Sequence, residues 1–241
     1  MNERVLNTYI KYSDKLNNIQ LNKGALYIVS TPIGNLEDIS FRAIYILKNV
    51  DLIAAEDTRK TNFLLTQYDI RNRTISYYSQ VETSKLEYLL DELKSGKSVA
   101  LVSDAGTPGI SDPGNLLISG CIENNIEIFS IPGANALMHA LVLSSFPTNK
   151  FYFQGFLPLK KGRQTLFEEL AKFRMPVIIY ESPFRIYKTL KDILEFFGNK
   201  EISVSRELTK KFEQVIRGKV KTILDQNIKV KGEFVIIINN I

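Results

Sequence analysis

Short apolar runs alternate with amphipathic stretches through the first half of the chain. The apolar runs have the length of strands and lie at residues 25–30, 52–55, 74–77, 99–103 and 127–131. Helical patterns separate or follow them, at residues 39–48, 58–68, 82–94, 115–125 and 134–146. Because strands and helices alternate in this way, the pattern predicts a mainly parallel sheet covered by helices.

The rhythm changes after residues 145–150, a polar segment that contains one proline. Strand patterns then lie at residues 151–156, 177–180, 202–205, 213–217 and 234–239, and helical patterns at 163–174, 184–197 and 219–225. A charged hairpin within residues 206–217 predicts some antiparallel pairing. We therefore predict an α/β fold of two domains, with an N-terminal extension at 1–23, a domain with a mainly parallel sheet at 24–147 and a domain with a mixed sheet at 148–241.

The composition is that of a soluble globular protein, with 44% hydrophobic and 24% charged residues. No apolar run approaches the length of a membrane span, and the N-terminal residues lack the apolar segment of a signal peptide. We therefore expect a cytoplasmic protein with no membrane partner. The single cysteine, Cys121, excludes an internal disulfide and fits a reducing compartment, and its place in a helical pattern favours a buried side chain.

One cysteine and one histidine cannot build a Cys/His metal site, so we expect no metal. His139 lies in the apolar helical run at 134–146, which favours a packed or partly exposed histidine over a catalytic one. The net charge of +5 permits a polyanionic partner but does not require one. Clusters of basic residues all fall in the second half, at 160–163, 206–211 and 217–221.

The segment 103–114 (SDAGTPGISDPG) directly follows a buried strand pattern and precedes a helical one. It holds three glycines, which let backbone approach a ligand, and two prolines, which restrict the loop to few shapes. Ligands of open α/β sheets bind just beyond the carboxyl ends of strands. This segment therefore predicts a small-molecule site.

Three further strand ends carry unusual loops, at residues 30–38 (STPIGNLED), 54–60 (AAEDTRK) and 131–134 (IPGA). The first matches neither nucleotide-phosphate motif, and it is also consistent with a tight connection in which Asp38 or Ser40 caps a helix. The second fits equally an N-cap with favourable charges and a substrate-facing role. Four such loops suggest one shared sheet edge that forms a cleft.

The second half contributes three charged motifs, at residues 180–185 (YESPFR), 206–210 (RELTK) and 231–235 (KGEFV). Each is consistent with a salt-bridged loop. Together they can also add charged side chains to a cleft wall, namely Glu181, Arg185, Arg206, Glu207 and Glu233.

These motifs, with residues 30–38, 56–59 (EDTR) and 103–114, occur in an order that resembles the tetrapyrrole methylase superfamily, and within it the branch that modifies ribosomal RNA. The resemblance runs from about Gly24 to Ile238. It implies S-adenosylmethionine (S-adenosyl-L-methionine) as methyl donor and 2′-O-methylation of a cytidine ribose in the decoding region of 16S rRNA. It further implies a homodimer, with 16S rRNA or the small ribosomal subunit as partner and a cofactor cleft between two α/β domains.

On the same resemblance, a set of loop residues is expected near the cofactor: Pro32, Gly34, Asp104, Ala105, Gly106, Ser111, Asp112, Pro132, Gly133, Ala134 and Tyr180. The chain departs from the family in two places where relatives often carry histidine, at residues 77–81 (YYSQV) and at Phe184. The absence of both histidines argues against a required histidine base.

Methyl transfer to a hydroxyl requires alignment of the reactants and a group that accepts one proton. The carboxylates that could accept it are Glu56, Asp57, Glu181 and Glu207. We place Glu56 and Arg59 at the reacting edge, with Glu181 next, as the catalytic residues. The residues expected to bind substrate phosphate or steady an alkoxide are Lys60, Arg185, Arg206 and Lys210.

Two alternatives stay open at this point. C-methylation of a tetrapyrrole is disfavoured by the EDTR element and by the basic second half. A non-catalytic RNA-binding or ribosome-assembly protein is suggested by the missing histidines.

Overall fold

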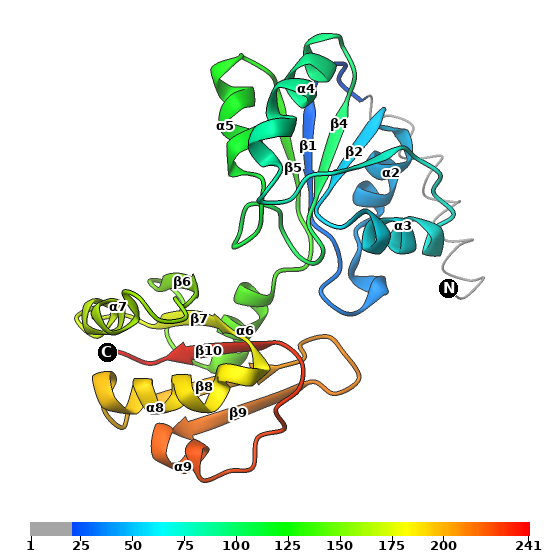
Figure 1. Ribbon diagram of the computed structural model, residues 1–241. Helices are drawn as coiled ribbons and strands as arrows, with labels where there is room; N and C mark the ends of the chain where they lie inside the picture. Colours follow the sequence, from blue (N-terminus) through cyan, green and yellow to red (C-terminus); the bar gives the residue numbers. More distant parts are fainter. Residues whose placement is uncertain (1–20) are drawn as a thin grey trace. The chain divides into compact units, whose positions relative to one another are not determined.

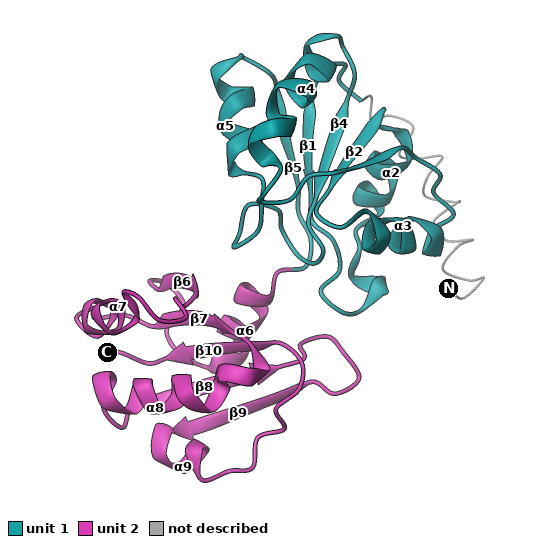
Figure 2. Ribbon diagram, viewed as in Figure 1, with its two compact units in different colours: residues 1–134 teal, residues 135–241 magenta. Residues whose placement is uncertain are grey.

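The computed structural model describes residues 21–241, so most of the predicted extension at 1–23 lies outside the described residues. The chain divides into two compact units between Ala134 and Asn135 (Figure 2). Each unit contains one five-stranded sheet (Figure 1).

The sheet of the first unit is entirely parallel, with strand order β3-β2-β4-β1-β5. Its strands are β1 (Leu26–Val29), β2 (Leu52–Ala55), β3 (Thr74–Ser76), β4 (Val99–Val102) and β5 (Ile128–Ile131). Its helices are η1 (Leu36–Asp38), α2 (Phe41–Asn49), α3 (Thr58–Gln67), α4 (Glu82–Lys94) and α5 (Asn115–Glu123). The predicted parallel sheet with intervening helices is confirmed.

Two hydrophobic cores lie on opposite faces of this sheet, which explains why its central strands are continuously apolar. In β4, Ala100 and Val102 belong to one core, together with residues of α2 and α3. Val99 and Leu101 belong to the other, together with residues of α4 and α5. Figure 1 shows these two helix pairs on either side of the sheet.

The second unit has a mixed sheet in the order β6-β7-β10-β8-β9, in which only the β6–β7 pair is parallel. Its strands are β6 (Tyr152–Phe156), β7 (Val177–Glu181), β8 (Glu201–Arg206), β9 (Gln214–Lys219) and β10 (Phe234–Ile238). Its helices are α6 (Ala136–Ser144), α7 (Arg163–Leu170), η2 (Pro183–Arg185), α8 (Ile186–Phe197) and α9 (Val220–Leu224). The antiparallel pairing predicted from the charged hairpin is therefore confirmed.

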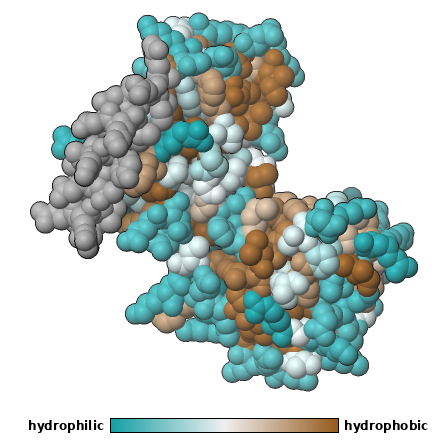
Figure 3. Space-filling model, turned by 180° about the vertical axis from the view of Figure 1, so that it is seen from behind, coloured by the Kyte–Doolittle hydropathy of each residue, from teal (hydrophilic) through white to brown (hydrophobic). Residues whose placement is uncertain are grey.

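Helix α6 belongs to the second unit, so the units divide earlier in the chain than the predicted boundary at residues 147–148. The helix packs against β8, β9 and β10, with Ala140 and Leu141 buried. Its outer side exposes Met138 and Val142. Figure 3 shows a hydrophobic area on the surface of this unit. Because α6 is apolar on nearly all sides, its sequence does not indicate which face of the helix is buried or which of the two sheets it covers.

The structure also shows the surroundings of Cys121 and His139, the single cysteine and the single histidine of the chain. Cys121 is completely buried in α5, and burial raises the pKa of its thiol to about 11. It is therefore a protonated core side chain, as predicted. His139 lies on the exposed side of α6. Within residues 21–241, no helix is both long and apolar enough to cross a lipid bilayer.

Substitution of Gly114, at the start of α5, tests how tightly the loop at residues 103–114 packs against the sheet. Its φ is +139°, and a Cβ there would lie 2.8 Å from Leu101 Cδ2. We expect Gly114→Ala to lower the free energy of unfolding by more than about 2 kcal/mol, because overpacking adds to backbone strain. Urea unfolding measures the change.

Gly96→Ala is the matched control, because Gly96 also has a positive φ, of +91°, but a Cβ there meets nothing within 4 Å. We expect it to lose only about 1–2 kcal/mol, from backbone strain alone. Equal losses in the two variants would contradict the proposed clash with Leu101.

Candidate active site at the strand ends of the first unit

The carboxyl ends of β1, β2 and β4 meet at one edge of the first sheet, as the sequence predicts, because β2, β4 and β1 are neighbours and run in parallel. A cavity of about 660 Å³ lies at this edge, a size typical of small-molecule sites. It is lined by Thr31, Pro32, Gly34, Leu36, Asp57, Arg59, Lys60, Thr61, Phe63, Leu64, Ser103 and Asp104. Five of the predicted site residues are therefore brought together here: Pro32, Gly34, Arg59, Lys60 and Asp104.

The loops that follow β1 and β4 are paired to each other beyond the end of the sheet. The Thr31 amide donates to the Gly106 carbonyl at 2.8 Å, and the Gly106 amide donates back to the Thr31 carbonyl at 3.0 Å. The Thr31 hydroxyl also donates to the Ser103 carbonyl at 3.2 Å. Gly106 has a φ of +86°, which favours glycine at this position. These bonds fix the floor of the cavity.

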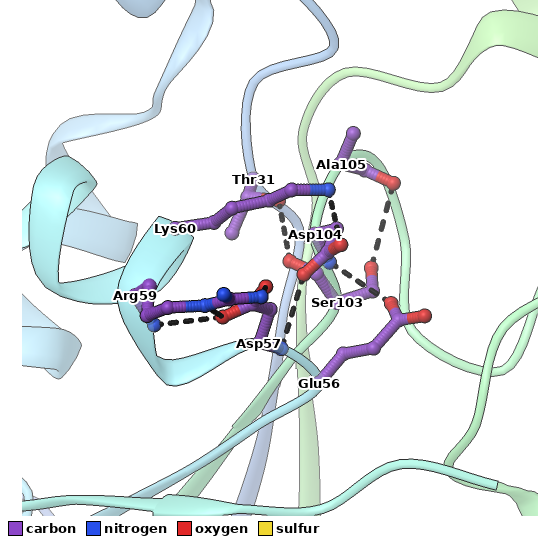
Figure 4. Close-up of polar contacts among 8 residues, drawn as sticks. All are labelled: Thr31, Glu56, Asp57, Arg59, Lys60, Ser103, Asp104 and Ala105. Atoms are coloured by element: carbon purple, nitrogen blue, oxygen red, sulfur yellow. Dashed lines mark hydrogen bonds and ion pairs between the residues drawn. The ribbon is translucent and has the colours of Figure 1, made fainter.

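Asp104 joins the loop after β4 to the loop after β2 (Figure 4). Its backbone amide donates to Glu56 Oε2 at 3.1 Å, and its Oδ1 accepts from the Asp57 amide at 3.1 Å. Its Oδ2 pairs with Lys60 Nζ at 2.6 Å. Each loop therefore uses a carboxylate to hold a backbone amide of the other. The hydrogen bond to Asp104 raises the pKa of Lys60, so this side chain is a cation at neutral pH.

Asp57 caps helix α3, which confirms the N-cap interpretation of the EDTR segment. Its Oδ1 accepts from the Arg59 amide at 2.9 Å, and its two oxygens also accept from the Arg59 guanidinium at 3.0 and 2.7 Å. These hydrogen bonds hold the pKa of Asp57 well below its usual range. The Arg59 side chain remains 90% exposed and lines the cavity, so the cap and a cation at the cavity coexist in one segment.

The apolar wall of the cavity was not predicted from the sequence. Leu36, Phe63 and Leu64 form it. Phe63 is 62% exposed and lies one helical turn after Arg59, a spacing that places both on the same side of α3. That spacing is the signal that could have identified it. Leu36 is held in place by the Tyr68 hydroxyl, which donates to its carbonyl.

The other loop residues predicted near the cofactor in the first unit differ in their exposure. Gly133 packs directly on the loop after β1, since a Cβ there would lie 2.9 Å from Ser30 Cβ. Ala105, Pro132 and Gly133 are exposed. The other predicted residues near these loops are Gly106 and Ala134, both buried.

Ser111 and Asp112, predicted as cofactor contacts, lie further along the loop and are not among the residues that line the cavity. Ser111 adopts a φ of +63° in the turn that leads to α5. Ser111 and Asp112 therefore belong to the turn that leads into α5 and not to the wall of the cavity.

In the second unit, Glu181 is at the centre of a buried network. Its side chain is fully buried and accepts from Arg185 at 2.7 Å, from the Thr189 hydroxyl at 2.6 Å and from the Ser182 amide at 2.7 Å. Arg163 donates to the Thr189 hydroxyl at 2.8 Å. A proton acceptor must reach its substrate. These contacts instead favour a structural role for Glu181 and for its partner Arg185.

Arg206, expected to bind substrate, is buried and donates to the Lys231 and Phe212 carbonyls at 2.8 and 3.0 Å. It thus ties together the second and third charged motifs. Figure 1 shows the strands that carry these motifs, β8 and β10, side by side. These contacts are hydrogen bonds to backbone carbonyls, and the salt bridges of the two motifs are made by Lys210.

The remaining predicted residues of the second unit are also engaged within it. Lys210 pairs with Glu207 at 2.9 Å and with Glu233 at 2.8 Å. The Tyr180 hydroxyl accepts from the Leu137 amide at 3.0 Å, at the start of α6.

Comparison with known proteins places these features in context. The family described as Tetrapyrrole (Corrin/Porphyrin) Methylases matches residues 25–224. A protein of Halalkalibacterium halodurans named ribosomal RNA small subunit methyltransferase I is 47% identical over 219 residues, which cover 90% of this chain and 76% of that protein. The protein of the same name in Thermotoga maritima is 44% identical over 218 residues, which cover 90% of this chain and 98% of that protein.

Solved structures share the fold at low sequence identity. Uroporphyrin-III C-methyltransferase of Thermus thermophilus superposes with a TM-score of 0.63 at 14% identity, covering 90% of this chain and 96% of that one. A structure of the same enzyme type from that organism, in complex with S-adenosylhomocysteine, gives 0.62 at 15% identity and covers 88% and 96%. The cobalamin biosynthetic enzyme cobalt precorrin-4 methyltransferase gives 0.63 at 16% identity and covers 89% and 94%.

Thr189→Val tests the structural role of the Glu181 network. Valine preserves the shape of this buried side chain but removes the hydroxyl that serves both Glu181 and Arg163. We expect the free energy of unfolding to fall by about 1–3 kcal/mol, because a buried carboxylate oxygen loses its donor. Chemical unfolding measures the loss.

The matched control is Thr66→Val on α3, where the threonine is exposed and its hydroxyl donates to the Asn62 carbonyl. A change within about 0.5 kcal/mol is expected there. If both variants lose the same amount, the network around Glu181 does not stabilise the fold.

Proposed function

The chain belongs to the tetrapyrrole methylase family and, within it, to the ribosomal RNA small subunit methyltransferases I, and on this basis we propose that it methylates the 2′-hydroxyl of a cytidine ribose in the decoding region of 16S rRNA. The observation that carries this proposal is 44–47% identity to these relatives over about 90% of the chain. S-adenosylmethionine is the methyl donor of such an enzyme, in keeping with the S-adenosylhomocysteine bound to one structural neighbour.

The strand-end loops of the first unit are suited to S-adenosylmethionine. Ala105 and Gly133 are exposed and carry a methyl group and no side chain, respectively, which allows close approach of a nucleoside. Gly34 and Asp104 line the adjoining cavity and add polar groups. We propose that the cofactor is held by Pro32, Gly34, Asp104, Ala105, Gly106, Pro132, Gly133 and Ala134. When bound, it supplies a methyl group carried on a cationic sulfonium.

The cations at the cavity suit a polyanionic acceptor. Arg59 is exposed, and Lys60 is kept protonated by Asp104. In the proposed reaction, both contact RNA phosphate and hold the ribose in place. Positioning two bound reactants can lower a barrier by roughly 7–11 kcal/mol in favourable cases. Because Lys60 stays protonated, it stabilises negative charge and does not serve as the base.

Glu56 is the proposed proton acceptor. Its Oε2 accepts from the amide of Asp104, a residue that lines the cavity, and Glu56 is partly exposed although it is not itself a lining residue. The ribose 2′-oxygen would bond to the methyl group as the carbon–sulfur bond of the donor breaks and leaves a neutral thioether, and the hydroxyl proton would pass to Glu56. Glu181, by contrast, is buried and fully engaged within the second unit, so the proposal leaves it out of the reaction.

The proposal also covers the location, the partner and the oligomeric state of the protein. We propose that the protein acts in the cytoplasm on 16S rRNA or the small ribosomal subunit, and that it works as a homodimer. Sedimentation of the purified protein tests the oligomeric state. The porphyrin-related neighbours share only 14–16% identity, so they support the fold and not a tetrapyrrole substrate.

Methyl transfer from labelled S-adenosylmethionine tests the function directly. The acceptor is small-subunit rRNA, free or in assembled subunits, from cells that lack this protein. We expect label in the RNA and one new 2′-O-methylated cytidine when modified positions are mapped. Absence of transfer to both substrates would sink the proposal. RNA binding without cofactor binding in calorimetry would instead indicate an assembly protein.

Glu56→Gln tests the proton acceptor. Glutamine keeps an oxygen that can accept from the Asp104 amide but has no basic carboxylate. We expect kcat to fall by about 100-fold or more, with the affinity for S-adenosylmethionine unchanged. Glu87→Gln, an exposed carboxylate on α4, is the control and should leave kcat unaltered. An unchanged kcat in Glu56→Gln would remove Glu56 from the mechanism without affecting the proposed reaction.

A further inference from the structure

Phe184 is the most exposed large hydrophobic side chain within residues 21–241, with 91% of its surface accessible. It lies in η2, the single turn between β7 and α8. A phenylalanine ring in water is unfavourable, so its presentation on the surface calls for an explanation.

The turn that carries Phe184 is firmly anchored. Arg185, the next residue, pairs with the buried Glu181 at 2.7 Å and donates to the Leu157 carbonyl at 3.2 Å. Ile186, which follows, is completely buried. The exposed ring is therefore held out from an ordered turn, with fixed residues behind it.

A second exposed segment is tied to the same turn. The bond from Arg185 to Leu157 attaches the loop at residues 157–162, and Arg163 donates to the Pro158 carbonyl at 3.2 Å. In this loop Leu159 is 69% exposed, and Lys160 and Lys161 are exposed as well.

The loop follows Phe156, the last residue of β6, which is 55% exposed. Its ring packs edge-on against Tyr180 at a centroid distance of 5.6 Å. One turn after Phe184, Lys188 is exposed on α8. Because Tyr180 contacts the start of α6, Phe156 lies on the other face of the sheet from α8 and is not counted with Phe184. We call the remaining set the aromatic–lysine surface: Leu159, Lys160, Lys161, Phe184 and Lys188.

The charge of this surface has a single sign. Residues 156–164 and 182–188 contain three lysines and two arginines but no aspartate or glutamate. The two arginines are occupied within the fold, whereas the lysines are exposed. Such a surface is complementary to phosphate. A purely apolar partner would leave three ammonium groups without counter-charges.

We propose that the aromatic–lysine surface binds an unpaired segment of RNA, with one base stacked on Phe184 and the lysines on its phosphates. The proposal rests on the ribosomal RNA function proposed above and adds the part of the chain that holds the substrate. An exposed aromatic ring beside lysines is a combination that binds single-stranded nucleic acid, because every base has a face that stacks. Paired bases are hidden in a helix, so a duplex does not fit this role.

The chain contains no tryptophan, so Phe184→Trp introduces a unique fluorescent reporter at the surface. We expect its emission to be quenched, to saturation, when the protein is titrated with a short single-stranded oligoribonucleotide, since stacking on a base quenches indole. The same sequence annealed to its complement should quench far less. Ile122→Trp, at an exposed position of α5 in the first unit, is the matched control and should not respond.

Binding of a fluorescein-labelled form of the oligonucleotide, followed by anisotropy, tests the individual contributions. Phe184→Ala should weaken binding at least tenfold and raise the KM for RNA, with no change in affinity for S-adenosylmethionine. Lys160→Gln combined with Lys161→Gln should reduce the slope of log affinity against log salt by about 1.4, because each phosphate contact of a single strand contributes about 0.7. Because these side chains are exposed, the melting temperature should not change.

The outcomes separate this surface from the proposed reaction. If the unaltered protein binds the oligonucleotide while Phe184→Trp is not quenched and Phe184→Ala binds normally, the surface is overturned and the methyltransferase proposal is unaffected. If neither the unaltered protein nor any variant binds single-stranded RNA, the proposed role of this surface is wrong as well. Methyl transfer to intact subunits then tests the proposed function separately. If Phe184→Ala changes the oligomeric state and not RNA affinity, the surface is a contact between copies and the proposal is wrong.

Discussion

The reciprocal contact between Asp104 and the segment after β2 is the constraint on which the candidate site depends. Parallel strands deliver their loops to one edge, but nothing in a sheet requires neighbouring loops to adopt a common shape. Here the Asp104 amide is held by Glu56, and the Asp104 carboxylate holds the Asp57 amide and the Lys60 ammonium. The two loops therefore fold as one unit. The position of each charged group at the cavity follows from this shared framework.

The same arrangement divides the work among charged residues that are adjacent in the sequence. Asp57 caps α3 and orients Arg59, whereas Lys60 reaches across to the neighbouring loop. Glu56 is anchored through one oxygen only in the contacts described. Four charged residues within five positions would be difficult to distinguish by composition, yet each makes different contacts and therefore has a different capacity to act on a ligand.

The sequence predicts the elements of both sheets well, because buried strands leave continuous apolar runs and surface helices leave a periodic stripe. The shared edge of the first sheet follows from strand direction alone. The boundary between the units could not be obtained in this way, since α6 is apolar on nearly all sides and its sequence does not select a sheet. Phe63 was missed because the sequence does not show the cavity beside it, although its spacing from Arg59 places both residues on the same side of α3.

The charged motifs of the second unit show a different limit. Glu181, Arg206 and Lys210 have the residue types of a catalytic site, but the structure gives them partners inside their own unit. Some of these partners are distant in sequence, namely Lys231 for Arg206 and Glu233 for Lys210. The close approach also depends on details such as Gly232, where any Cβ would overlap the Glu207 carboxylate. Composition and spacing do not encode such contacts. A charged residue in a motif can therefore bind a substrate or stabilise the fold, and its charge alone does not distinguish the two roles.

Helix α3 faces two ways, and this has an evolutionary consequence. Leu64 and Leu65 pack into the core, while Arg59 and Phe63 point outward at the cavity edge. Exposed positions can be exchanged with little loss of stability, so the cavity-facing side of this helix is free to diverge while the core beneath it is retained. A lineage could thus change the molecule it methylates without first rebuilding its fold. The coexistence of porphyrin-related and ribosomal names among proteins of this one architecture is what such freedom would produce.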